Sequence, residues 1–171
     1  MKRLIAFTVT ALLLCGCGIY TLSFSGTSIE PDVNTININF FEYKAQKVNP
    51  TLSNDLTEAL RSQFRRMTRL EQVDVDGDMV ITGEIVGYDI TPQAITANEV
   101  AARNRLTVSV NVSFENKKHP EGDFSKKGFS AYSDYDSTQT LDAVESGLSK
   151  EIVDKLVEDI FNATVAQWET R

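Results

Sequence analysis

Two cysteines, Cys15 and Cys17, lie at the end of an apolar segment near the start of the chain. A cysteine thiolate is a strong nucleophile, so a thiol in this position could accept an acyl or diacylglyceryl group. The preceding residues 4–14 carry no charge, and they follow Lys2 and Arg3. A short basic start and an apolar run of this length are typical of a secretory signal peptide, because a membrane-spanning helix needs about 20 apolar residues.

The order Leu14-Cys15-Gly16-Cys17 resembles the bacterial lipobox, in which an aliphatic residue and two small residues precede a lipidated cysteine. The sequence therefore predicts that the chain is exported, cut before Cys17 and modified there with fatty acids such as palmitate. Two or three acyl chains hold a protein durably on a membrane, whereas a single chain binds only marginally. Because Gly18, and not an aspartate, follows the cysteine, we expect the protein to be lipid-anchored in the outer membrane and to face the periplasm.

These assignments divide the chain into a signal peptide (1–16), a lipidated tether (17–32) and a single domain (33–171). Cys15 leaves with the signal peptide and Cys17 carries lipid, so no thiol remains for a disulfide bond, a metal site or catalysis. The whole chain has 17 basic and 24 acidic side chains, a formal net charge of −7. A chain this acidic is not expected to be a general nucleic-acid binder.

The rest of the sequence offers no arrangement that favours catalysis. His119 is the only histidine, and it lies in a basic turn without metal-ligating neighbours. The acidic turn at residues 74–78 begins like a calcium loop, but Ile85 stands where that loop needs a glutamate. Asp134 and Asp136 could serve a hydrolase, although acidic residues near loops and helix starts usually act as caps and solvated charge. We therefore expect neither an enzyme nor a bound metal or cofactor.

Basic side chains gather in two sets that could contact phosphate groups. One set lies in a predicted helix, and the other lies near both ends of a predicted hairpin. Such sets could bind the phosphates of lipopolysaccharide through charge-assisted hydrogen bonds. The alternative is ordinary solvated charge that, in the helix, also complements the helix dipole. The candidate lipopolysaccharide-binding residues are Arg61, Arg65, Arg66, Arg103, Arg105, Lys117, Lys118, Lys126 and Lys127.

Apolar residues recur at the strand period in some segments and at the helical period in others, which predicts four strands and two helices. Alternating residues predict strands at 33–41, 79–90, 103–116 and 124–135. The first strand is expected to bury Ile36, Ile38 and Phe40. A stripe at the helical period predicts one helix that is capped by Thr51 or Ser53 and runs to Met67, and another over residues 140–168. Gly83 and Gly87 interrupt the second strand and indicate a bulge or a close backbone approach.

The strand at residues 103–116 has the clearest pattern, with an apolar side and a polar side formed by Thr107, Ser109, Asn111 and Ser113. One buried and one polar face is typical of an antiparallel meander packed on helices. The sequence therefore predicts an α+β fold, a two-layer sandwich in which a four-stranded, mostly antiparallel sheet carries two helices on one face. The uncovered polar face could pack inside a polar barrel lumen or simply contact water.

Four stretches resemble the LptE family of lipopolysaccharide-assembly lipoproteins, in a divergent branch, and the likeness extends over nearly all of the predicted mature chain. The stretches are Phe24-Ser25-Gly26-Thr27-Ser28, Val48-Asn49-Pro50-Thr51-Leu52-Ser53, Gly83-Glu84-Ile85 with Gly87-Tyr88, and Asn104-Arg105-Leu106-Thr107-Val108. The resemblance implies helices packed on one side of a four-stranded sheet. It also implies a role as plug and assembly partner of the LptD β-barrel, through which lipopolysaccharide reaches the cell surface.

A periplasmic glycan-binding or surface-assembly lipoprotein is the alternative interpretation of the sequence. It requires an aromatic platform for sugar rings, and only Tyr132, Tyr135 and Trp168 are plausible members of one. A hydrolase, as a third hypothesis, would depend on Asp134 or Asp136.

Overall fold

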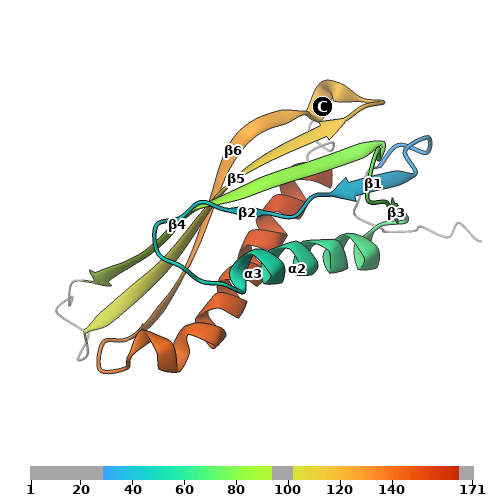
Figure 1. Ribbon diagram of the computed structural model, residues 1–171. Coiled ribbons are helices and arrows are strands. Elements are labelled where there is room, and N and C mark those ends of the chain that lie inside the picture. Colours follow the sequence, from blue (N-terminus) through green and yellow to red (C-terminus); the bar gives the residue numbers. More distant parts are fainter. Residues whose placement is uncertain (1–28, 94–101, 166–171) are drawn as a thin grey trace, which may run out of the picture.

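The computed structural model describes residues 29–93 and 102–165, which form six strands and two long helices (Figure 1). The predicted signal peptide, Cys17, most of the tether and Trp168 lie outside these residues. The elements are β1 (Thr35–Ile38), β2 (Glu42–Tyr43), α2 (Leu52–Met67), β3 (Glu71–Gln72), β4 (Met79–Gln93), β5 (Arg103–Asn116), a 3₁₀ turn (Pro120–Gly122), β6 (Phe124–Asp136) and α3 (Leu141–Val165). The α+β class is confirmed.

The sheet has the order β3-β1-β4-β5-β6, with β2 also paired to β4. Strands β4, β5 and β6 form the predicted antiparallel meander. Strand β1 runs parallel to both β3 and β4, and β2 runs parallel to β4. The predicted four-stranded sheet is therefore wrong in detail, because the sheet is mixed and has six strands. Helix α2 makes the parallel pairing possible, since it is the crossover between β1 and β3.

Helices α2 and α3 cover the same face of the sheet, as Figure 1 shows, with α2 over β1 and β3 and α3 over β5 and β6. Their apolar stripes meet between the layers, where the rings of Phe64 and Phe161 pack edge to face at 5.0 Å between centroids. Leu56, Leu60 and Ile152 are fully buried in the same core. Met67, the last residue of the predicted stripe of α2, is 49% exposed.

Helix α2 is capped by a residue that the sequence analysis did not consider. The side-chain oxygen of Asn49 accepts hydrogen bonds from the backbone amides of Thr51 and Leu52, at 3.2 and 3.1 Å. Thr51 occupies the N-cap position but makes no capping bond with its side chain, and Ser53 is already inside the helix. The prediction that Thr51 stands at the N-cap is therefore confirmed, but its side chain does not cap the helix, because the chain turns before the helix and brings Asn49 over its first amides.

The edge of the sheet is interrupted between β1 and β2. The chain leaves the ladder after Ile38 and rejoins β4 at Glu42, so Phe40 is 57% exposed while Phe41 is fully buried. The expectation that Phe40 is buried is wrong, because the interruption reverses the alternation by one residue. The ring of Phe41 lies against Gly83, where a Cβ atom would come within 2.2 Å of it. Gly83 thus marks the close approach of a side chain and not the backbone approach that was predicted.

The second predicted irregularity also occurs, since the β4–β5 register shifts between Ile85 and Gly87. Strand β5 has the predicted bounds, and its apolar side is buried from Leu106 to Phe114. Within residues 29–93 and 102–165, neither helix has the length and hydropathy needed to cross a bilayer.

Candidate interaction surface

The face of β4, β5 and β6 that the helices leave uncovered is called the open face here. The centre of this face carries very small side chains. The strand register places Ser109 between Gly87 and Ser130, and it places Gly128 beside Asn111. The hydroxyl oxygens of Ser109 and Ser130 lie 3.2 Å apart. We call Gly87, Ser109, Gly128 and Ser130 the small-residue field. Small side chains let another backbone or a bulky side chain approach a sheet closely.

An ordered aromatic side chain borders this field. Tyr132 is 48% exposed, and the guanidinium carbon of Arg105 lies 3.6 Å from its ring centroid. Arg105 in turn donates two hydrogen bonds to the Asp134 carboxylate, at 2.6 and 2.8 Å. These bonds, together with the charge of Arg105, lower the pKa of Asp134. Tyr132, Arg105 and Asp134 form what we call the Tyr132 platform, and stacked Tyr and Arg side chains of this kind are frequent anchors of protein interfaces.

The Tyr132 platform is also held from the helix layer. The ammonium group of Lys155, in α3, donates a hydrogen bond of 2.9 Å to the backbone carbonyl of Tyr132. A ring fixed by its neighbours loses little conformational entropy when a partner covers it. The platform is therefore held at the Tyr132 ring by Arg105 and at the Tyr132 backbone by Lys155.

A notch of about 340 Å³ lies at the other side of the open face, beside the interruption between β1 and β2. The exposed ring of Phe40 lines it. Lys126 also lines it, and this residue has a positive φ of 50° where the β5–β6 register shifts. The bulge turns Lys126 onto the open face, where its amide donates to the Ser113 hydroxyl at 3.0 Å.

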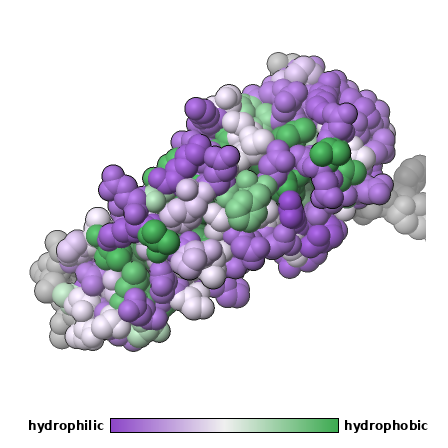
Figure 2. Space-filling model, in the orientation of Figure 1, coloured by the Kyte–Doolittle hydropathy of each residue, from purple (hydrophilic) through white to green (hydrophobic). Residues whose placement is uncertain are grey.

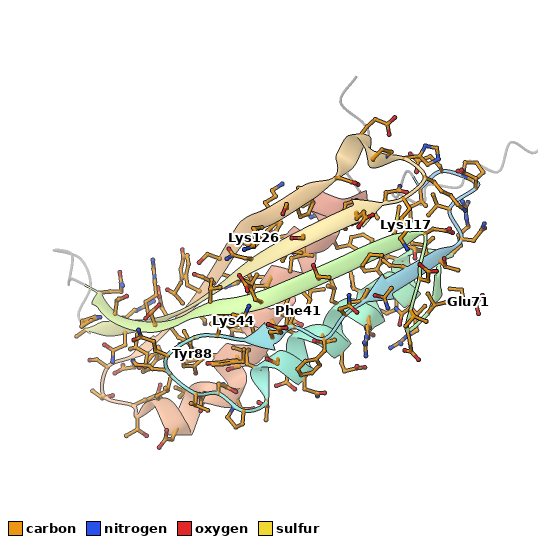
Figure 3. The ribbon with its side chains drawn as sticks, turned by 45° about the horizontal axis from the view of Figure 1, so that its top comes forward. Phe41, Lys44, Glu71, Tyr88, Lys117 and Lys126 are labelled. Carbon is orange, nitrogen blue, oxygen red and sulfur yellow. The ribbon has the colours of Figure 1, made fainter. Side chains whose placement is uncertain are left out.

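Glu84 is the main carboxylate in the notch. It accepts hydrogen bonds from Lys44 at 2.5 Å and from Asn111 at 3.3 Å. The bond from Lys44 is the principal cause of the lowered pKa of Glu84. Figure 3 shows that Lys44 and Lys126 come from different segments, since Lys44 directly follows β2 and Lys126 belongs to β6. Glu84 is therefore an ionised carboxylate whose charge is balanced by Lys44.

The nine predicted lipopolysaccharide-binding residues do not form one cluster. On α2, Arg61 donates to the Ile38 carbonyl at 3.2 and 2.8 Å, where β1 ends. Its other nitrogen pairs with Glu58 at 2.9 Å. Arg65 and Arg66 are exposed, and in the described part of the chain they bind the side chains of Gln72 and Gln63. Arg61 therefore helps to close the sheet edge, whereas the other two face solvent.

The basic residues of the hairpin are divided between the two ends of β5. Arg103 lies at the start of β5, at the same end as Arg105. Lys117 binds Asp76 at 2.8 Å, and Lys118 binds Asp78 at 3.0 Å, both at the opposite end. Two more, Lys126 and Lys127, lie near the start of β6, and the ammonium group of Lys127 is 5.1 Å from the Phe124 ring centroid. Whether any of the nine binds lipopolysaccharide stays a prediction.

The acidic turn at residues 74–78 has a structural role that its sequence did not reveal. One oxygen of Asp78 accepts hydrogen bonds from the amides of Asn34 and Thr35, at 2.9 and 3.1 Å. These bonds, and the bond from Lys118, lower the pKa of Asp78 to about 2. The only histidine, His119, lies beside this turn and bonds the carboxylate of Asp32 at 2.9 Å. This cluster fixes the start of β1 to the ends of β4 and β5.

The aromatic platform predicted for glycan binding is not assembled in the described residues. Tyr135 is 8% exposed and lies on the helix-covered face, opposite to Tyr132. The acidic pair predicted for a hydrolase is engaged elsewhere, since Asp134 binds Arg105 and Asp136 accepts a bond from the Thr138 amide at 2.8 Å. The surface in Figure 2 is mainly hydrophilic, with apolar patches interrupted by polar side chains.

Comparison with known proteins gives one family match. The model of the family described as LptE, lipopolysaccharide-assembly, matches residues 33–164. No curated protein matches the sequence significantly.

Several solved structures align with this chain. The hypothetical protein CT253 from Chlamydia trachomatis aligns at a TM-score of 0.50 and 9% identity, over 75% of this chain and 94% of that chain. A minor lipoprotein from Acinetobacter baumannii aligns at 0.44 and 16% identity, over 75% and 89% of the two chains. Lipoprotein GNA1162 from Neisseria meningitidis aligns at 0.42 and 13% identity, over 75% and 99%.

Proposed function

Because the chain belongs to the LptE family of lipopolysaccharide-assembly proteins, we propose that it is an outer-membrane lipoprotein that assembles with an LptD-type β-barrel and plugs its lumen. The precursor is cut after the signal peptide (1–16), Cys17 carries the lipid, and residues 17–32 tether the domain to the membrane. The protein acts as a scaffold for lipopolysaccharide transport to the cell surface.

The observation that carries this proposal is the open face, which is uncovered and polar and has small side chains at its centre. The lumen of an outer-membrane barrel is lined by polar side chains, so a polar sheet face can replace water there without burying unpaired apolar surface. The small-residue field lets the barrel wall approach the strands closely. The Tyr132 platform then supplies a rigid aromatic contact beside the field.

Lipopolysaccharide contact is the second part of the proposed function. Within the described residues, Arg103 and Lys126 form no ion pair, whereas Lys117 and Lys118 already bind Asp76 and Asp78. A phosphate competes less with existing bonds at an unpaired cation. We therefore expect Arg103 and Lys126 to contribute more to lipopolysaccharide binding than the two paired lysines.

Purification from outer membranes in mild detergent tests the barrel assignment. The native chain should recover a large β-barrel in stoichiometric amount. Ser109→Arg, which places a long charged side chain in the small-residue field, should lose the barrel. Asn162→Arg, on an exposed position of α3, is the matched control and should retain it. Full recovery of the barrel with Ser109→Arg would contradict the use of the open face.

Two further measurements separate the other parts of the proposal. Mass spectrometry of the membrane-extracted protein should find a mature chain that begins at a lipid-modified Cys17. An unprocessed chain, or an unmodified thiol, would exclude the lipid anchor. In binding assays with purified lipopolysaccharide, Lys126→Glu should weaken binding more than Lys117→Glu, and equal effects would contradict the assignment by ion-pair status.

A further inference from the structure

Strand β6 ends the sheet opposite to β3, and its outer edge is unpaired within the described residues. It is 13 residues long, whereas β3 at the other end has two. The outer edge of a long strand presents unpaired amide and carbonyl groups, which can template the addition of another strand.

The charges of β6 are arranged so that the strand is complementary to a copy of itself. Its first part carries Lys126 and Lys127, and its last part carries Asp134 and Asp136. When two such strands pair antiparallel about Ser130, Lys126 of one copy stands opposite Asp134 of the other, which also keeps its two bonds from Arg105. Opposite charges directly across an antiparallel pair stabilise it. A twofold axis also makes every such contact occur twice.

The helix-covered face of β6 adds a second complementary contact. In the same register Lys127 of one copy stands opposite Ser133 of the other. The Ser133 hydroxyl donates to the Glu151 carboxylate of α3 at 2.6 Å, so an acid lies beside the incoming lysine. Neither Lys126 nor Lys127 forms an ion pair in the described part of the chain, and Lys127 lies over the Phe124 ring instead.

We propose that two copies of this chain associate through their β6 strands, paired antiparallel about Ser130, to form one continuous sheet. This inference goes beyond the proposed function and does not depend on a barrel partner. One contact must be released on pairing, the bond from Lys155 to the Tyr132 carbonyl. Lysines and a bulge at an edge strand also oppose pairing, which makes a stable monomer the competing outcome.

Disulfide trapping tests the register directly. Ser130→Cys lies on the twofold axis of the proposed pair, so the membrane-extracted chain should form a disulfide-linked dimer under mild oxidation. Ser109→Cys lies on the same face but in β5, between β4 and β6, and cannot meet its copy. Both variants keep the native cysteines, so a dimer linked through those would appear equally in both. Equal crosslinking of the two variants, or none with Ser130→Cys, overturns the proposal.

Charge exchange gives an independent readout that does not use cysteine. Lys127→Glu should weaken dimerisation about threefold to tenfold in sedimentation equilibrium, as expected for the loss of cross-strand charge pairs. Glu151→Lys should weaken it similarly, and the double variant should restore it. Circular dichroism of each variant verifies that the domain is folded. A dimer unaffected by either single change, or not restored by the double change, contradicts the proposed register.

Discussion

Replacing Gly83 by alanine places a methyl group against the ring of Phe41. The added Cβ would lie 2.2 Å from Cε1, 2.5 Å from Cδ1 and 2.6 Å from Cζ of that ring. Favourable carbon–carbon contacts lie at about 3.5 to 4.0 Å, so the ring must move by about 1.3 Å. Phe41 is fully buried between β4 and α2, where its amide bonds the Thr57 hydroxyl at 3.1 Å. The ring therefore has no free space to enter.

The expected cost follows from two limits. Forcing extra methylenes into a packed core costs about 1 to 3 kcal/mol. Losing a buried phenylalanine side chain completely costs about 3 to 5 kcal/mol. A glycine-to-alanine change also lowers the conformational entropy of the unfolded chain, which offsets the loss of stability by about 0.4 to 1 kcal/mol. We expect Gly83→Ala to lower the free energy of unfolding by about 2 kcal/mol.

Urea unfolding followed by circular dichroism measures this change. Gly128→Ala is the matched control, because its nearest neighbour, the Asn111 side-chain oxygen, lies at an ordinary distance of 3.9 Å. In a Phe41→Leu background two of the three contacting ring atoms are absent, so Gly83→Ala should cost clearly less there. The reasoning is refuted if Gly83→Ala costs as little as Gly128→Ala, or costs the same in both backgrounds.

Three further predictions concern other parts of the chain. Gly147 is exposed in α3 with nothing within 4 Å of an added Cβ, so Gly147→Ala should raise the free energy of unfolding by about 0.5 to 1 kcal/mol. Asn49→Ala should lower it by about 1 kcal/mol through loss of the α2 cap, while Thr51→Ala changes it little; equal effects would contradict the capping assignment. The hydrogen bond to Asp32 raises the pKa of His119, so this ion pair stabilises the fold below the ordinary histidine pKa and the stabilisation is lost as pH rises through the raised value. Titration of this histidine by NMR should show a raised pKa that Asp32→Asn returns to normal, and an unchanged pKa in the variant would disprove the pairing.

Much of the fold could be predicted because it depends on patterns that repeat along the chain. Strand β5 alternates without interruption, so its bounds and its polar side followed from the sequence. The stripes of α2 and α3 each return at the helical period and predicted both helices. Strands β2 and β3 could not be predicted in this way, because two residues are too few to show a period.

The candidate site could be predicted only in part, because it depends on register. The sequence indicated the polar side of β5, but the small-residue field also needs Gly87 and Ser130 placed beside Ser109. The stacking of Arg105 on Tyr132 likewise joins residues from two strands. Ion pairs between distant segments leave no local pattern in the sequence. The ion pairs of Lys117 and Lys118 could therefore not be predicted, although both form in the structure.

The contacts at the start of β1 have a mechanical consequence for the tether proposed above. Lys118 bonds both the Asp32 carbonyl and the Asp78 carboxylate, and Asp78 holds the amides of Asn34 and Thr35. A pull on the tether therefore reaches the ends of β4 and β5 before it strains β1. The load would then be shared by β1, β4 and β5, which lie side by side in the sheet. Tension from the proposed lipid anchor would thus be spread over three strands before it reached the pairing of β1.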